Sequence, residues 1–409
     1  MRTILPGWLL LATLFLSCQK PLFTSIPRSP RTGAPTHGRS SGAPAEEAAP
    51  DVPPDVYLTA LRFPEGVNWR TDPGGGAQVV LFKNGTECLS VPVAGVPDPE
   101  RHRVIRGQLW TDESDGARTV VSCNGQERFR HPGAELYRGF LVTGGAVHTL
   151  GQRQGWEGLC YRIDGQERFS ADIGTLLGSA DDREWEGGAF CHDSTGLYYV
   201  YGVPIRTADA LLWEYKVMCG GQLLRTVPAG SAETLYDIRV LDGTVYRSER
   251  RSGGGHFLVQ DTQAEPLGLG SRESPHLCKL VAVDGRMLVK GYTGGSSRLS
   301  CSFWLRRPGE IFCTAVSMYL ITELLYHDGQ VAYVALDPDG RLAEIALEKE
   351  KLPVPAGQYL LATPRCAAFR KGVLGVALSA AEGDEHLVCL GGECTPYHFN
   401  GYFTSLVID

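Results

Sequence analysis

The hydrophobic residues of the chain fall into short runs, and several of these runs end at a tight turn. The runs at residues 79–82, 119–121 and 159–161 are followed by Asn84-Gly85, Asn124-Gly125 and Asp164-Gly165. An Asn-Gly or Asp-Gly pair between two strand-like runs is the strongest short-range signal of a β-hairpin. No long segment has the period of an amphipathic helix. The pattern therefore predicts a chain built from tight β-hairpins.

The hairpin sequence is repeated along the chain. Residues 125–129, Gly-Gln-Glu-Arg-Phe, recur at 165–169, and a looser copy begins at Asn84. A second series of turns falls between the hairpins at a nearly constant spacing of about 43 residues. Its glycines are Gly66, Gly107, Gly145, Gly196, Gly243, Gly285, Gly329 and Gly372. Turns at one period indicate a matching number of structural repeats.

One repeat contains four strand-like runs, as residues 277–283, 286–292, 299–305 and 310–315 illustrate. Four short antiparallel strands in each repeat of about 43 residues are typical of a blade of a β-propeller. Eight blades fill the chain from Tyr57 to Asp409, and seven is the alternative if a terminal repeat is degenerate. We predict an all-β fold, a β-propeller of eight four-stranded blades. Residues 401–409 are expected to pair with the amino-terminal blade and close the ring, which removes exposed strand edges.

The first 54 residues have a different composition. Residues 1–17 have the features of a secretory signal, with Arg2 before an apolar stretch that is too short to span a bilayer. The sequence Phe15-Leu16-Ser17-Cys18 resembles a bacterial lipobox, although the family prefers leucine where Phe15 stands. The resemblance implies a lipid on Cys18 and, with Gln19 next, sorting to the outer membrane. Residues 18–54 are rich in Ser, Pro, Gly and Ala, which predicts a disordered tether to a folded domain at 55–409.

The cysteines suggest one disulfide. Without the predicted lipidation site Cys18, 11 of the 12 cysteines remain, an odd number that leaves at least one thiol unpaired in a monomer. If Gly391-Gly392 is a two-residue turn, Cys389 and Cys394 lie opposite each other, about 4.5 Å apart at Cα, within disulfide range. Cys301 and Cys313 make a weaker pair. The remaining cysteines are expected to be reduced core residues.

Charge and motifs exclude several classes of function. The formal net charge is -7 and acidic and basic residues are interspersed, so the chain lacks the basic footprint of a nucleic-acid-binding protein. It has none of the common short signatures of metalloproteases, hydrolases, nucleotide sites or zinc knuckles. The 10 histidines are scattered, and a site shared by histidines from several repeats is the only metal alternative. We expect no cofactor, no metal and a monomer.

One insertion supplies a candidate ligand face. The longest repeat contains Asp181, Asp182, Glu184, Trp185 and Glu186. Acidic side chains beside an aromatic ring could bind a ligand, and a solvated loop is the simpler alternative. A series of aromatic residues lies three positions after the turn glycines, where packing between blades competes with stacking on sugar rings. Its members are Trp69, Trp110, His148, Tyr199 and Tyr246.

The motif Val80-Leu-Phe-Lys-Asn-Gly85 carries a family resemblance. Over Tyr57 to Asp409 the chain resembles the uncharacterised β-propeller lipoproteins of Gram-negative bacteria, whose blades have an apolar strand before Asn-Gly or Asp-Gly. The resemblance implies the fold and a location in the cell envelope. We predict a membrane-tethered binding or scaffolding protein for a protein or glycan, with no identifiable catalytic activity. The alternative is a carbohydrate hydrolase or lyase with acidic residues at the channel mouth.

Overall fold

The computed structural model describes residues 53–409 with short gaps, and these residues are strands, turns and the 3₁₀ turns η1 (Pro99–Arg101) and η3 (Pro364–Cys366). The gaps are residues 72–75, 94–96, 154–157, 173–174, 177–189, 194–195, 207–210, 229–231, 242, 252–254, 268–276, 284–285, 295–299, 308–309, 318–319, 328 and 349. No α-helix occurs among the residues described. The all-β prediction is confirmed.

The strands of the first half form four antiparallel sheets with help from the last strand of the chain. The strands of sheet 1 are β34 (Gly401–Ile408), β1 (Val56–Arg62), β2 (Gln78–Lys83) and β3 (Thr86–Pro92); those of sheet 2 are β4 (His102–Ile105), β5 (Gln108–Ser114), β6 (Arg118–Cys123) and β7 (Gln126–Pro132); those of sheet 3 are β8 (Glu135–Thr143), β9 (Ala146–Arg153), β10 (Gly158–Ile163) and β11 (Gln166–Asp172); those of sheet 4 are β12 (Thr175–Leu176), β13 (Phe190–Asp193), β14 (Gly196–Arg206), β15 (Leu211–Cys219) and β16 (Gln222–Pro228).

The second half repeats this arrangement within the described residues. The strands of sheet 5 are β17 (Ala232–Leu241), β18 (Thr244–Arg251), β19 (His256–Gln260) and β20 (Gln263–Pro266); those of sheet 6 are β21 (Leu277–Val283), β22 (Arg286–Gly294), β23 (Ser300–Arg307) and β24 (Glu310–Ser317); those of sheet 7 are β25 (Leu320–His327), β26 (Gln330–Leu336), β27 (Leu342–Leu347) and β28 (Glu350–Leu352); those of sheet 8 are β29 (Tyr359–Leu360), β30 (Ala367–Arg370), β31 (Val373–Ala380), β32 (Glu385–Leu390) and β33 (Glu393–His398). Sheets of consecutive antiparallel strands, packed in series, are propeller-like.

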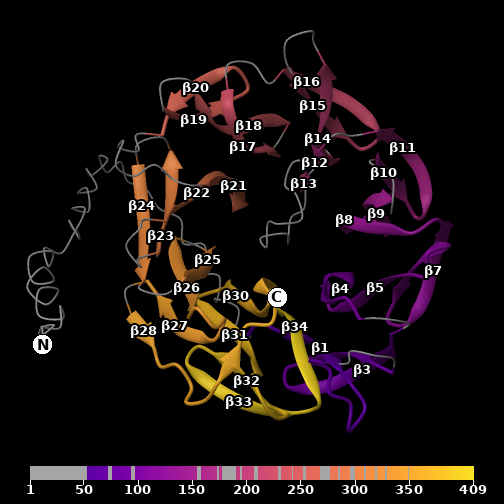
Figure 1. Cartoon of the computed structure of the whole chain (residues 1–409), viewed down its shortest axis with the longest axis vertical. Helices are drawn as coiled ribbons and strands as arrows, with labels where there is room; N and C mark the ends of the chain where they lie inside the picture. The colour runs from indigo at the N-terminus through magenta and orange to yellow at the C-terminus, as the bar shows by residue number, and fades with distance from the viewer. Residues whose placement is uncertain are drawn as a thin grey trace, which may run out of the picture. The chain divides into compact units, whose positions relative to one another are not determined.

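The two ends of the described chain meet in sheet 1. Strand β34 pairs antiparallel with β1, with Leu58 opposite Leu406 and Tyr57 opposite Val407, and Figure 1 shows the two strands side by side. Inside this pair the hydroxyl of Thr59 is 2.7 Å from that of Thr404 and 2.6 Å from that of Ser405. The prediction that the last strand pairs with the amino-terminal sheet is confirmed.

The repeated Asn-Gly and Asp-Gly turns have two roles that explain the residue types. Asn84, Asn124 and Asp164 have positive φ angles, as do the glycines after them, which is the geometry of a tight hairpin turn. Each side-chain oxygen also accepts a hydrogen bond from the backbone N–H at or near the start of the second strand of its sheet. The donors are Val56 (2.8 Å), Leu109 (2.9 Å) and Val147 (2.9 Å). The turn therefore fixes both its own hairpin and the neighbouring strand.

The second series of turns is displaced in sheet 1. Gly107, Gly145 and Gly243 lie between the first and second strands of their sheets, whereas Gly66 lies in the loop between β1 and β2. The difference arises because β34, the first strand of sheet 1, comes from the other end of the chain. Sheet 1 therefore has no turn at the position that Gly66 was predicted to occupy.

The core lies between neighbouring sheets. Apolar clusters join sheets 1 and 2, 2 and 3, 3 and 4, 4 and 5, 5 and 6, 7 and 8, and 8 and 1, and β24 of sheet 6 lies against β25 of sheet 7. Sheets covered on both faces need strands that are apolar on both faces, as in β26. A fully buried apolar side chain such as Leu58 or Phe403 contributes about 1.5–3 kcal/mol.

The first strands of several sheets are interrupted where they bend. In β8 the register shifts by one residue between Tyr137 and Gly139, and β17 and β25 have the same irregularity. In sheet 8 the interruption is longer, because β29 and β30 both pair with β31 and residues 361–366 lie between them. This longer excursion contains η3 and carries Arg365 toward sheet 2.

Candidate functional site

The predicted ligand face cannot be compared with the fold. Asp181, Asp182, Glu184, Trp185 and Glu186 lie outside the described residues. The predicted lipidation site, Cys18, also lies outside them. Both assignments stay predictions.

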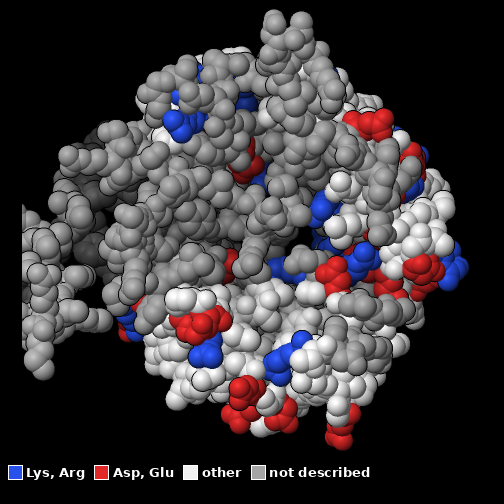
Figure 2. All heavy atoms as spheres, in the orientation of Figure 1, with Lys and Arg blue, Asp and Glu red and all other residues white. Residues whose placement is uncertain are grey.

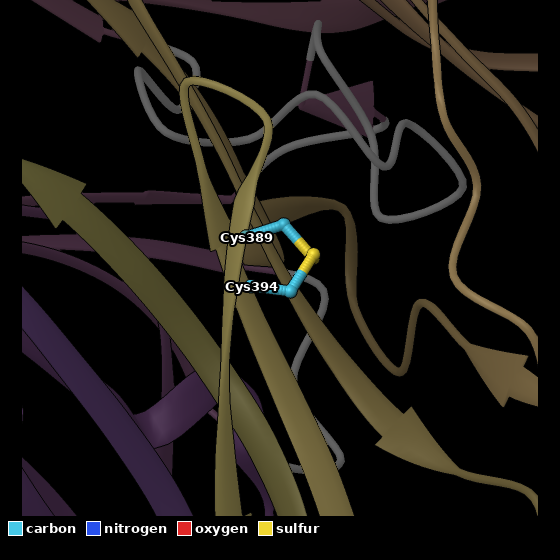
Figure 3. The surroundings of a disulfide bond; sticks show 2 residues. All are labelled: Cys389 and Cys394. Atoms are coloured by element: carbon cyan, nitrogen blue, oxygen red, sulfur yellow. A yellow bond between two sulfur atoms is a disulfide. The ribbon is translucent and has the colours of Figure 1, made fainter.

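The hairpin β32–β33 contains the one disulfide seen in the described part of the chain. Cys389 lies opposite Cys394, next to the pair Leu390 and Glu393, and Gly391 and Gly392 form the turn with positive φ. The two sulfur atoms are 2.01 Å apart and the Cα atoms 4.0 Å apart (Figure 3). This is the register that the sequence predicted.

The weaker predicted cysteine pair does not have such a register. Cys301 on β23 lies opposite Val316, and Cys313 on β24 lies opposite Trp304. The register of the two strands shifts between Trp304 and Leu305 and again between Leu305 and Arg307, so the strands are not paired symmetrically about Arg307. The backbone therefore does not bring these two cysteines face to face.

The aromatic series packs between sheets. Trp110 and Tyr199 are buried in the clusters that join sheets 2 and 3 and sheets 3 and 4. The imidazole of His148 lies 2.7 Å from the hydroxyl of Tyr161. Trp69, which follows the displaced turn at Gly66, instead stacks beside Tyr402 at the end of sheet 1. The buried rings of Trp110 and Tyr199 therefore form no surface for sugar stacking, whereas Trp69 and His148 are partly exposed.

A buried ion pair crosses sheet 3. Glu135 of β8 accepts a 2.8 Å hydrogen bond from Arg162 of β10, and both residues are at least 95% buried. Gly151 lies on the strand between them, and a Cβ atom there would be 2.5 Å from Glu135 Oε2. Because Gly151 has no side chain, the carboxylate of Glu135 has room to reach across β9 to Arg162.

The ion pair continues into a polar seam between sheets 2 and 3. His131 of β7 lies 2.6 Å from the hydroxyl of Tyr137 and 3.7 Å from the carboxylate of Glu135. Burial, with the carboxylates of Asp112 and Glu135 nearby, raises the pKa of Tyr137. The tyrosine therefore keeps its proton and acts as a hydrogen-bonding group in the seam.

Arginines surround the buried carboxylate of Asp112 on β5. Arg103 Nη1 is 2.5 Å from Asp112 Oδ1, and Arg101 Nη1 is 3.9 Å from Asp112 Oδ2. The Asp112 side chain is 0% exposed, whereas the Arg103 and Arg101 side chains are 19% and 24% exposed. The aspartate therefore holds two guanidinium groups that still reach solvent.

A third arginine arrives from sheet 8. Arg365 of η3 donates from Nη1 to the backbone oxygen of His102 at 3.0 Å and from Nη2 to that of Pro99. Burial and the surrounding guanidinium groups, Arg365 first, lower the pKa of His102 to about 3. The imidazole is therefore neutral at ordinary pH, and the positive charge of the cluster resides on the arginines. We call Arg101, Arg103, Arg365, His102 and Asp112 the arginine cluster.

The outer strands of the first four sheets differ at two positions just after the hairpin turn. The second and third residues after the turn glycine are Glu87 and Cys88 in sheet 1, Glu127 and Arg128 in sheet 2, and Glu167 and Arg168 in sheet 3. In sheet 4 the same positions on β16 are Leu223 and Leu224, which are 55% and 48% exposed. The charged pair that sheets 2 and 3 carry at these positions is thus replaced in sheet 4 by two exposed leucines.

Sequence comparison within the chain contained the signal for this edge. Gly221-Gln-Leu-Leu224 aligns with Gly125-Gln-Glu-Arg128, so the loss of both charges can be read without a structure. The arginine cluster had no such signal, because its members come from separate repeats.

Other features of the described residues are less specific. Figure 2 shows acidic and basic side chains interspersed over the described part of this face. Among these residues no group of three or more histidine, cysteine or acidic side chains is arranged to hold a metal ion. In the same set of residues, no helix has the length and apolar character needed to cross a bilayer.

Comparisons with known proteins give a limited result. No protein-family model and no curated protein matches the chain. Among solved structures, the chain is similar to the computationally designed Ika8 protein (15% identity, 75% of this chain and 89% of the other, TM-score 0.46) and to BamB from Moraxella catarrhalis (12%, 84% and 98%, 0.44). It is also similar to the β-propeller domain of the Trilobed protease from Pyrococcus furiosus (11%, 73% and 91%, 0.44). Likenesses at these scores carry no argument about function.

Proposed function

We propose that this chain is a protein-binding scaffold, a closed ring of eight blades that recruits a partner along the outer edge of sheet 4. The proposed ring is supported by the apolar clusters between neighbouring sheets, by the contact of β24 with β25 where no such cluster is described, and by the pairing of β34 with β1. The binding role is carried by one observation, the exposed Leu223 and Leu224 on β16.

An exposed edge strand normally carries charges that prevent pairing with another chain. Sheets 1 to 3 follow this rule with Glu87, Glu127 and Glu167. Strand β16 is the last strand of its sheet among the described residues, so its outer backbone groups are available for pairing. Apolar side chains at the position where sheets 1 to 3 have glutamate favour the addition of a strand from a partner.

The chemistry around β16 indicates what the partner contributes. Arg225 is paired with Asp261, and Lys216 is paired with Glu214. These ion pairs neutralise the charges beside the leucines, so a charged partner segment would gain little there. The proposed occupant is therefore an extended, uncharged apolar segment of another protein, which adds to β16 as a further strand.

Substitution of Leu223 by lysine is expected to weaken binding of the partner at least about tenfold, because it restores a charge at the edge. The partner is to be captured from cell-envelope extracts with the purified chain and then titrated against it. Hydrogen exchange in the complex should show new protection of the β16 amides. The matched control is Glu127→Lys, at the equivalent position of sheet 2, which should bind as the wild type does.

Three results would contradict the strand-addition proposal. Equal binding by the Leu223→Lys and wild-type chains would exclude the β16 edge, as would protection confined to other strands. Concentration-dependent dimers that Leu223→Lys abolishes would show that the occupant is a second copy of the chain, and would also overturn the proposal as stated.

The location belongs to the same proposal. We propose that the chain is held at the bacterial envelope by a lipid on Cys18, on the strength of the Phe15-Leu-Ser-Cys18 sequence.

Replacement of Cys18 by serine is expected to move most of the protein from the membrane fraction to the soluble fraction, because one residue carries the whole anchor. Labelling with a radioactive or clickable fatty acid measures the modification directly, and Cys88→Ser is the control. Unchanged labelling of the Cys18→Ser chain would refute the anchor.

A further inference from the structure

We propose that the arginine cluster is a binding site for a carboxylate group of a ligand or partner. It lies where the segments leading into the first strands of sheets 2 and 8 meet, and it is separate from the β16 edge. Its three guanidinium groups come from η1, β4 and η3, which the fold brings together from distant parts of the sequence.

The charges of the cluster do not balance. Arg101, Arg103 and Arg365 carry three positive charges, and the carboxylates that contact them are Asp98, 3.5 Å from Arg101, and Asp112. His102 is neutral and adds no charge, since burial and the arginines depress its pKa. With both carboxylates ionised, these contacts leave one positive charge in excess, which a monoanion would neutralise. Burial raises the pKa of Asp112, and protonation of this carboxyl would only enlarge the excess.

Several N–H donors of the arginine cluster have no hydrogen-bond acceptor among the described residues. Asp112 accepts a hydrogen bond from only one nitrogen of Arg103, and its distance to Arg101 is too long for a hydrogen bond. Arg365 Nε is buried and has no hydrogen-bond acceptor among the described residues. Guanidinium groups that keep free N–H donors and remain partly exposed are suited to a carboxylate, because the two planar forks match.

Asp112 acts as a positioning residue in this proposal. Its side chain is buried on strand β5, and its carboxylate binds one nitrogen of Arg103. This ion pair orients the Arg103 guanidinium and leaves its other N–H donors available. Arg103 also lies 4.9 Å above the ring of Phe140, which limits its orientation further. A preoriented arginine loses little side-chain freedom when it binds.

The alternative is that the arginines only tie sheets 8 and 2 together. Arg365 does make that connection through the backbone oxygens of Pro99 and His102. Arg101 and Arg103 make no hydrogen bond to sheet 8 among the described residues, so tying these two sheets together does not explain them. Binding measurements on these two residues therefore separate the two interpretations.

The experiment uses acetate as the probe, with acetamide as its neutral analogue and chloride at equal ionic strength. Saturation-transfer NMR and calorimetry on the folded chain should detect saturable acetate binding that acetamide and chloride do not reproduce. Arg103→Lys keeps the positive charge beside Asp112 but removes the planar fork, and should weaken acetate binding at least about tenfold. Arg118→Lys, at an exposed ion pair with Asp115, is the matched control and should bind acetate as the wild type does.

Three outcomes would overturn the proposal. Acetate binding that is absent, or that chloride reproduces, would leave no carboxylate site. If Arg103→Lys keeps both its melting temperature and the wild-type affinity for acetate, the Arg103 guanidinium does not bind the carboxylate. Glu100 precedes Arg101 in the chain, so a Glu100→Gln variant is included; acetate binding seen only in that variant would mean that the chain supplies its own carboxylate.

Discussion

A chain that ends at Asn400 is expected to lose its cooperative unfolding transition and to aggregate. The truncation removes β34, which buries Phe403, Leu406 and Ile408 and pairs with the whole length of β1. Losing each of these large side chains costs about 2–5 kcal/mol, and the sum approaches the 5–15 kcal/mol that stabilises a typical domain. Strand β1 would also become an exposed apolar edge, which favours aggregation. Calorimetry and light scattering measure both effects.

Two companions make this test specific. Removal of Asp409 alone is expected to leave the transition within a few degrees of the full-length value, because that residue is exposed. A synthetic peptide of residues 401–409, added to the truncated chain, should restore part of the transition by occupying the vacated position beside β1. A truncated chain with a full-length melting temperature would contradict the proposed closure of the ring through sheet 1.

Replacement of Arg162 by methionine is expected to destabilise the fold by about 3–5 kcal/mol. The methionine fits the apolar part of the arginine but leaves the carboxylate of Glu135 buried without its ion-pair partner. Gly151 and Tyr137 close over that carboxylate, so water cannot easily replace the lost guanidinium. Urea unfolding followed by tryptophan fluorescence and circular dichroism measures the change in free energy.

The double variant Glu135→Gln, Arg162→Met separates a stranded charge from lost packing. Removing both charges should recover a large part of the stability that Arg162→Met loses, because no buried charge is left alone. Arg168→Met, on the exposed strand β11, should change stability by less than about 0.5 kcal/mol. If the double variant is as unstable as Arg162→Met, the loss comes from packing and the electrostatic explanation is wrong.

Local chemistry made much of the fold predictable. The Asn-Gly and Asp-Gly turns set the hairpins, and the Gly391-Gly392 turn gave the register of Cys389 and Cys394, since a two-residue loop leaves only one pairing. The position of Gly66 was less predictable, because it depends on which end of the chain supplies the first strand of sheet 1. A regular spacing of turns does not carry that information.

The candidate sites differ in how far a sequence can reveal them. Leu223 and Leu224 stand where an internal copy has Glu127 and Arg128, so a comparison of repeats exposes the change. His102 and Arg365 belong to different repeats and are in contact only because η3 leaves the regular path of sheet 8. This contact depends on the three-dimensional path of an irregular segment, which cannot be predicted from the repeat spacing of the sequence.

The pairing of Thr59 with Thr404 and Ser405 joins residues as many as 346 positions apart in the chain. During synthesis, therefore, the strand that begins at residue 56 emerges long before its neighbour, residues 401–408, has been made. Contacts between such distant segments form slowly, because a long loop must close first. A chain released before β34 is made could form most of its sheets, but the edge of β1 that pairs with β34 would stay exposed. We expect such a chain to depend most on a chaperone.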